Sequence, residues 1–167
     1  MKLIGKGSFS EVYKFNSEKV VIKTIDPIKE AMAVGFFPNS KLFPKIDFFD
    51  HMDYGDDFKY IMKYDEDLKS KSVISKLKPY YQNMYRQLRE IQGIFRNLND
   101  YEYKISSLKG VRKYHKDALI KAYWAIMNYL DERDIAFEIS PRNVSTKNGR
   151  LILNDCFFSV SLLNKTN

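Results

Sequence analysis

The first quarter of the chain contains short apolar runs separated by polar turns. β-Branched and aromatic residues gather at positions 2–4, 12–15 and 20–24. Runs of this length and composition, bounded by polar residues, are typical of β-strands. The polar stretch 16–19 between the second and third runs predicts a hairpin turn.

A single short helix is predicted after these strands. Asp26 is a suitable N-cap, and Pro27 suits the first helical position because its missing N–H is not needed there. The helix should continue through Glu30 to about Val34, before Gly35. Strand character returns at 46–49 and 58–64, so the chain up to about residue 65 is expected to be mostly sheet with one helix.

Beyond residue 65 the apolar positions change to helical spacing. They recur 4, 3, 4, 3, 4 and 3 residues apart, at Leu77, Tyr81, Met84, Leu88, Ile91, Phe95 and Leu98. After a polar loop at about 99–113, a second apolar face follows at Leu119, Tyr123, Ile126 and Leu130. We expect two antiparallel helices that pack on each other. A coiled-coil surface for a partner is the alternative interpretation of the first face.

The last part of the chain predicts a β-hairpin. Apolar runs at 144–146 and 151–153 flank Lys147-Asn148-Gly149. Asn-Gly between two apolar runs is a strong signal for a tight hairpin turn, because both residues tolerate positive φ.

Composition indicates a folded protein without a membrane span. Of the 167 residues, 44% are hydrophobic and 15% aromatic, which exceeds what disordered chains carry. No apolar run approaches the ~18 residues needed to span a bilayer. Because the sequence opens with Met1-Lys2-Leu3-Ile4 and reaches a glycine-rich stretch at once, we expect no signal sequence and a cytoplasmic location.

The cysteine and histidine positions and the net charge limit which disulfides, metal sites and binding partners can be expected. Cys156 is the only cysteine, so no internal disulfide is expected, and its spacing from His51 and His115 predicts no transition-metal site. The net charge of +7 would attract acidic partners, including nucleic acid. The lysines are scattered and no aromatic-interleaved motif accompanies them, which favours a solvated basic surface.

A glycine-rich loop lies between the first two predicted strands. Gly5-Lys6-Gly7-Ser8-Phe9-Ser10 could bring backbone N–H groups close to a polyphosphate, because glycine has no Cβ to obstruct the approach. A Rossmann site would need a helix after the glycines, and the Walker Gly-Lys-Ser/Thr ending is absent. The following strand run, Val20-Val21-Ile22-Lys23, matches the V-A-I-K pattern in which a strand lysine pairs with nucleotide phosphates.

With these two motifs in order, residues 1–65 resemble the N-terminal lobe of a protein kinase. In that family a glutamate on the lobe's single helix holds the strand lysine, and Glu30 is at the matching position. Residues 61–65 resemble the last strand and the hinge, with Met62 at the gatekeeper position. The resemblance implies nucleotide contacts at Gly5, Lys6, Gly7, Ser8, Phe9, Val12, Lys23, Glu30, Met62 and Tyr64.

Residues 66–167 resemble a truncated, mostly helical second lobe. The segment 136–144 is similar to the kinase catalytic loop H-R-D-L-x-x-x-N, with Glu138 and Asn143 at the positions of its acid and asparagine. Asp155, at the end of a predicted strand, matches the D-F-G aspartate. The resemblance implies that Asn143 and Asp155 bind Mg²⁺ and that Glu138 is the catalytic base, acting with Lys23 on ATP.

Several positions depart from the kinase pattern. Ala136 and Phe137 replace His and Arg, Ser140 replaces the usual lysine, and the D-F-G motif is Asp155-Cys156-Phe157. Arg142 could supply the charge of the missing lysine. Glu138 replaces aspartate, and its extra methylene moves the carboxylate by ~1 Å, which could cost on the order of a hundredfold in rate.

The chain ends 12 residues after Asp155, so an activation segment, the A-P-E motif and the remaining helices of an ordinary second lobe are not expected. This pattern is similar to the small early serine/threonine protein kinases of short-tailed bacteriophages. The resemblance implies an α+β, minimal two-lobed fold that uses ATP and Mg²⁺ and phosphorylates host proteins in the host cytoplasm. Two alternatives remain: a pseudokinase that occludes a host protein or nucleic acid, and a small-molecule or toxin-type phosphotransferase.

Overall fold

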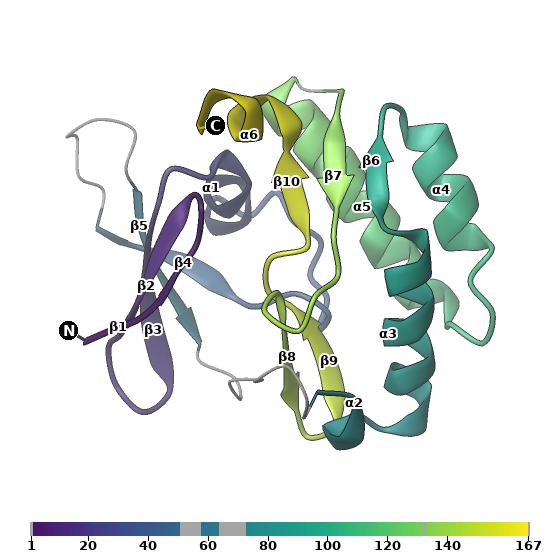
Figure 1. Cartoon of the computed structure of the whole chain (residues 1–167), viewed down its shortest axis with the longest axis horizontal. Coiled ribbons are helices and arrows are strands. Elements are labelled where there is room, and N and C mark those ends of the chain that lie inside the picture. Colours follow the sequence, from purple (N-terminus) through teal and green to yellow (C-terminus); the bar gives the residue numbers. More distant parts are fainter. Residues whose placement is uncertain (1, 51–57, 64–72, 132, 167) are drawn as a thin grey trace.

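The structure, a computed structural model, describes residues 2–50, 58–63, 73–131 and 133–166. It is an α+β protein, as the sequence predicts (Figure 1). A five-stranded sheet forms one side, and helices with shorter strands form the other, with one helix between them. Within these described ranges, no helix is both long enough and apolar enough to cross a membrane.

The five-stranded sheet is antiparallel throughout, with strand order β1-β2-β3-β5-β4. Its strands are β1 (Lys2–Lys6), β2 (Ser10–Lys14), β3 (Lys19–Thr24), β4 (Ile46–Asp50) and β5 (Phe58–Lys63). The central strand β3 buries Val20, Val21 and Ile22, since a strand with neighbours on both sides is the least exposed. The predicted strands of the first quarter are confirmed.

Helix α1 (Pro27–Ala33) begins and ends as predicted. The Asp26 carboxylate caps it by accepting a hydrogen bond from the Ile28 N–H at 2.9 Å, and Pro27 occupies the first turn. Gly35, at φ +86°, follows the C-cap in a conformation that favours glycine. The helix packs against β4 on one side and against α5 and β10 on the other.

The second half of the chain alternates helices with short strands. Its elements are α2 (Val73–Lys76), α3 (Pro79–Ile91), β6 (Gly93–Phe95), α4 (Leu98–Ser106), α5 (Lys113–Leu130), β7 (Ile135–Phe137), β8 (Val144–Lys147), β9 (Arg150–Leu153), β10 (Phe157–Ser159) and α6 (Val160–Thr166). Strands β10, β7 and β6 form one small antiparallel sheet, and β8 pairs with β9.

The prediction of one long helical face over 77–98 is wrong. Helix α3 ends at Ile91, Gln92 is extended, and residues 93–95 form β6, which pairs with β7. Gly93 favours the end of the helix at this point because glycine is a poor helix former. Spacing alone could not show that Phe95 is buried in a strand, because strand pairing is a tertiary contact.

The prediction of a polar loop at 99–113 is also wrong over its first half, where residues 98–106 form α4. Asn97 caps α4 by accepting a hydrogen bond from the Asp100 N–H at 2.9 Å. The main helical neighbour of α5 is therefore α4, and not α3 as predicted. The buried face of α3, at Met84, Tyr85 and Leu88, confirms a core role for that stripe over a coiled-coil surface.

The β8–β9 hairpin is confirmed. Asn148 and Gly149 both adopt positive φ, at 54° and 74°, as a two-residue type I′ turn requires. The Gly149 carbonyl accepts a hydrogen bond from the Lys78 N–H at 2.9 Å, which fixes the turn to the start of α3.

An aromatic cluster forms the centre of the second half. The Tyr101 and Tyr123 rings stack with centroids 4.3 Å apart, and Phe95, Phe137 and Phe157 surround them. Each tyrosine hydroxyl donates a buried hydrogen bond to a backbone carbonyl at 3.1 Å, from Tyr101 to Leu119 and from Tyr123 to Phe95. The cluster fixes β7 and β10 against α4 and α5.

Tyr101→Phe tests the contribution of one such hydroxyl. We expect the variant to lose about 1 kcal/mol of unfolding free energy, the usual worth of a buried neutral hydrogen bond. Urea denaturation of both proteins would measure the loss. Tyr103→Phe, at a side chain 76% exposed, is the matched control and should leave stability unchanged. Equal midpoints for the two variants would contradict this role for Tyr101.

Candidate functional site

Two chain segments with predicted site residues are brought side by side by strand pairing. Phe137 of β7 pairs with Phe157 of β10, and Val144 of β8 pairs with Leu153 of β9. The loop 138–143 and the segment 154–156 connect these same strands. Because the strands on both sides are paired, the two segments must run next to each other.

Backbone hydrogen bonds join the two segments directly. The Glu138 N–H donates to the Cys156 carbonyl at 2.9 Å, and the Asn143 carbonyl accepts from the N–H groups of Asn154 and Asp155 at 2.9 and 3.1 Å. The structure therefore brings Glu138, Asn143 and Asp155 into one site, although up to 17 positions separate them in the numbering of the chain. We call this arrangement the loop clasp.

The loop itself is held by two further contacts. The Asn143 N–H donates to the Ser140 carbonyl at 3.0 Å, and the Ile139 N–H donates to the side-chain oxygen of Gln92 at 3.1 Å. Ile139 is buried while Glu138 is exposed. The Glu138 carboxylate is thus presented to solvent from a fixed backbone, as a residue that must reach a substrate requires.

The glycine-rich loop closes the β1–β2 hairpin. The Gly7 N–H donates to the Ser10 carbonyl at 2.8 Å, and Gly7 and Ser8 are exposed. Phe9 is buried, and its carbonyl accepts from the Ile25 N–H at 3.1 Å and from the Thr24 hydroxyl at 3.0 Å. The loop tip is therefore anchored to the end of β3.

Lys6 and Val12, both predicted nucleotide contacts, lie on the same hairpin. The Lys6 ammonium is 3.2 Å from the Glu11 carboxylate, and Val12 lies opposite Gly5 in the ladder. The Tyr13 hydroxyl donates to Glu11, and this bond, followed by the charge of Lys6, lowers the pKa of the Glu11 carboxyl.

Lys23 and Glu30 lie on neighbouring elements, β3 and α1. Lys23 lies directly opposite Glu11 in the β2–β3 ladder. Burial, followed by the nearby charge of Glu30, raises the pKa of the Tyr129 hydroxyl on α5. Both residues are described, and the structure contains no ion pair between them. Of the other two predicted contacts, Met62 lies in β5 with a side chain outside the described part, and Tyr64 is outside the described residues.

The α1 residue that reaches the loop clasp is Lys29, which the sequence analysis did not select. Its ammonium lies 2.9 Å from Asp155 Oδ1 and donates to the Asn154 carbonyl at 2.5 Å. The Lys29 side chain is 5% exposed and that of Asp155 36%. A signal existed in the sequence: Lys29 is three positions before Met32, on the buried face of α1.

A further carboxylate near Lys29 and Asp155 is that of Asp26, which is buried. Burial, followed by the nearby Asp155 charge, raises the pKa of Asp26 to about 7. Burial alone would lower the pKa of Lys29, but the charges of Asp155 and Asp26 outweigh it and raise that pKa. Burial and the nearby charge of Asp155 therefore favour a proton on Asp26 near neutral pH.

Asp155 fits the role of a ligand to a hard cation. Its Oδ1 is shielded from solvent and receives no well-aligned hydrogen bond, although the Lys29 ammonium is close enough for an ion pair. The described residues contain no cluster of three His, Cys, Asp or Glu side chains. A magnesium ion at this site would therefore be held by Asn143 and Asp155, with water or oxygens of a bound phosphate completing its coordination.

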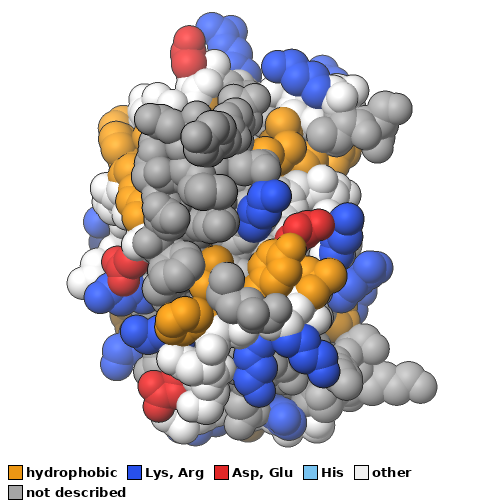
Figure 2. All heavy atoms as spheres, turned by 90° about the vertical axis from the view of Figure 1, so that its left-hand side faces the viewer, with side chains coloured by type: hydrophobic (Ala, Val, Ile, Leu, Met, Phe, Trp, Pro, Cys, Tyr) orange, Lys and Arg blue, Asp and Glu red, His pale blue; other side chains and the backbone are white. Residues whose placement is uncertain are grey.

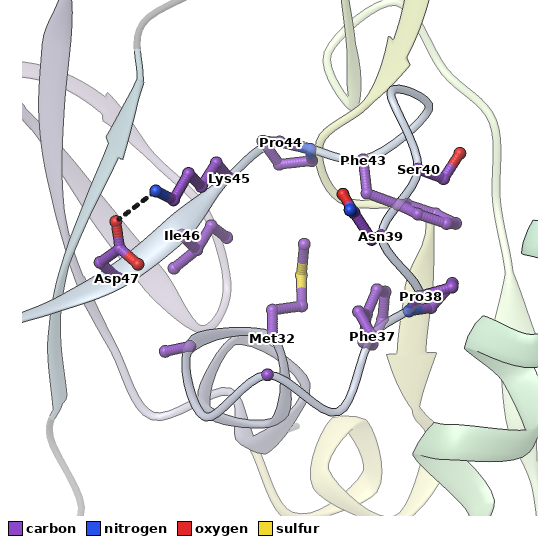
Figure 3. Close-up of a pocket in the computed structure, with 12 residues that line it drawn as sticks. Met32, Phe37, Pro38, Asn39, Ser40, Phe43, Pro44, Lys45, Ile46 and Asp47 are labelled. Atoms are coloured by element: carbon purple, nitrogen blue, oxygen red, sulfur yellow. Dashed lines mark ion pairs between the residues drawn. The ribbon is translucent and has the colours of Figure 1, made fainter.

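A cavity of about 390 Å³ lies between α1 and the segment 37–47 (Figure 3). Met32 projects into it from α1, and Phe37, Phe43 and Ile46 line it, with the Lys45–Asp47 ion pair at its edge. None of the predicted site residues lines this cavity. It does not serve as evidence for the nucleotide site.

Positive charge is spread over the surface. Figure 2 shows Lys and Arg side chains at the top, centre and bottom of the face that it views, in no single patch among the side chains it colours. Among the coloured side chains of that face, the positive charges form no continuous track.

Comparisons with known proteins found no relative of this chain. No protein-family model matches the sequence, and no curated protein or solved structure matches it significantly. The functional argument therefore depends on the site itself.

Proposed function

We propose that the protein is an ATP- and Mg²⁺-dependent phosphotransferase of the protein-kinase type that acts on serine or threonine. The observation that carries the proposal is the loop clasp, which gathers Glu138, Asn143 and Asp155 beside a helix packed on a five-stranded sheet. The glycine-rich hairpin and the strand lysine add support, because they occur in the order that kinase chemistry requires.

Each residue has a definite role in this proposal. Lys23 would hold the nucleotide phosphates, while Asn143 and Asp155 would supply oxygen ligands to magnesium, which neutralises charge on the transferred group. Glu138, exposed on a fixed backbone, would accept the proton of the substrate hydroxyl. By resemblance, the substrates would be proteins of a bacterial host and the location its cytoplasm.

Nucleotide binding can be tested by thermal unfolding. ATP should raise the melting temperature only when Mg²⁺ is present, because Asn143 and Asp155 would contact phosphate mainly through the metal. Lys23→Ala should reduce this shift. An unchanged melting profile at saturating ATP and Mg²⁺ would count against the site, and equal shifts for both proteins would count against Lys23.

Phosphate transfer needs a separate experiment. The protein would be incubated with radiolabelled ATP, Mg²⁺ and a bacterial lysate, beside the Asp155→Ala variant. Label should enter lysate proteins at serine or threonine only with the wild type. Magnesium-dependent nucleotide binding without any transfer would exclude the enzyme and leave a binding protein.

The pseudokinase alternative is favoured by one observation. Lys29 already places a positive charge on Asp155, the residue predicted to hold the metal. A protein that keeps the fold without using the metal could retain such an internal cation permanently. The transfer experiment separates the two functions.

A further inference from the structure

Lys29 occupies an unusual position for a lysine. It is 4% exposed, and its ammonium contacts Asp155 and Asn154, which lie more than a hundred residues further along the chain. Lysine is rarely buried to this degree unless it is paired. Among the ion pairs of the described residues, only that between Lys29 and Asp155 joins α1 to the segment after β9.

The ammonium binds the oxygen atoms that would suit a metal ion. An ammonium is a compact, strongly hydrated cation with three donors and takes carboxylate and carbonyl oxygens as partners. Magnesium takes the same kind of oxygen at 2.0–2.1 Å. With Asp155 Oδ1 already 2.9 Å from the ammonium, a metal on that oxygen would lie within a few ångströms of a second cation. Repulsion at that separation in a partly buried site is strong.

We propose that Lys29 is the positioning residue of this site: its ammonium holds the Asp155 carboxylate and must leave it when a divalent cation binds there. The Lys29–Asp155 ion pair is observed whatever the function of the protein. The competition between Lys29 and a metal for Asp155 rests on the proposed function. Because Lys29 belongs to α1, the proposal also ties the position of this helix to the occupancy of Asp155.

The buried surroundings of Lys29 contain a second carboxylate. Asp26, whose carboxylate caps the same helix, adds to the charge of Asp155 in raising the pKa of Lys29. Among the described ion pairs, Lys29 takes part only in the one with Asp155, so the competition concerns that one contact.

Mn²⁺ in the absence of nucleotide is the probe for the competition. Its binding, followed by electron paramagnetic resonance, should be at least tenfold tighter in Lys29→Met than in the wild type. Methionine keeps the unbranched, buried shape and removes the charge. The gain should disappear in the Lys29→Met/Asp155→Asn double variant, which locates it at Asp155. Lys41→Met, at an exposed lysine, should keep the wild-type affinity.

Equal Mn²⁺ affinity in folded wild type and Lys29→Met would overturn the proposal, as would a gain that survives in the double variant. If Lys29→Met does not fold, the wild type labelled with ¹⁵N-lysine provides a second measurement. One ammonium signal, identified by its loss in Lys29→Arg, should shift on addition of Mg²⁺ and also in Asp155→Asn. A signal that moves in neither case would also overturn it.

Failure of the proposed function gives a different result. If the wild type binds Mg²⁺–ATP and Lys29→Met shows no gain for Mn²⁺, the function stands and the role of Lys29 is wrong. If neither protein binds Mn²⁺ or Mg²⁺–ATP, the competition is overturned together with the metal site, and the lysine signal still reports whether the ion pair exists.

Discussion

Glu138→Gln is expected to abolish phosphate transfer while Mg²⁺–ATP binding remains. The amide keeps the shape of the side chain but cannot accept the proton of the substrate hydroxyl, so we expect a loss of a hundredfold or more. The backbone at Glu138 is fixed by the Cys156 carbonyl, so the substitution should not move the loop. Transfer from labelled ATP and the magnesium-dependent melting shift, measured on the same samples, would separate catalysis from binding.

The matched variant Glu138→Asp tests why this chain has glutamate where kinases have aspartate. If the clasped loop is adapted to the longer side chain, the shorter carboxylate should be slower, because an error of ~1 Å in position is costly. A nearly inert wild type that gains activity as Glu138→Asp would mean that glutamate is a decayed aspartate. Full activity in Glu138→Gln would show that this residue is not the base.

The ionisation of Asp26 is expected to contribute a loss of stability as pH rises from about 4 to about 7. Its pKa is raised to about 7 in the folded protein by burial and by the charge of Asp155. The folded state therefore binds a proton in this window that the unfolded state has released, and each pH unit costs up to about 1.4 kcal/mol. Asp26→Asn should remove this contribution. The difference in urea midpoint between the wild type and Asp26→Asn, measured at intervals over this range, would reveal it.

Asparagine keeps an oxygen that can accept the Ile28 N–H, so the helix cap is preserved while the charge is lost. Asp26→Asn should therefore gain stability over the wild type above pH 7 and differ little from it near pH 4. Asp131 is an exposed residue in the left-handed conformation, which asparagine also tolerates. The control variant Asp131→Asn should therefore keep the wild-type dependence of stability on pH. The same slope in Asp26→Asn would show that Asp26 ionises normally.

Local chemistry made a helix start and a hairpin turn predictable from sequence. Asp26 and Pro27 specify the start of α1 because capping involves neighbouring residues only. Asn148 and Gly149 specify the β8–β9 turn because both accept positive φ. The proximity of Glu138, Asn143 and Asp155 was predicted from motif order, and the strand pairs beside them bring it about.

The errors arose where the partner of a segment is distant in the chain. Residues 93–95 continue a helical pattern, yet they form β6 because β7, about forty residues later, offers a strand edge. The motif selected Glu30 from α1, and it gave no indication that the neighbouring Lys29 pairs with Asp155 of the loop clasp. Adjacent helix positions point about 100° apart, so only the docking of α1 decides which one reaches the site.

The sequence by itself determined the strands of the five-stranded sheet, the start of α1, the two turns and the chemical types of the candidate site residues, because these depend on neighbouring side chains and backbone preferences. The tertiary structure alone decided that α4 covers α5, that Phe95 lies in a strand, and that a buried lysine holds Asp155. Such contacts are set by which surfaces bury each other, and local spacing carries no record of that choice.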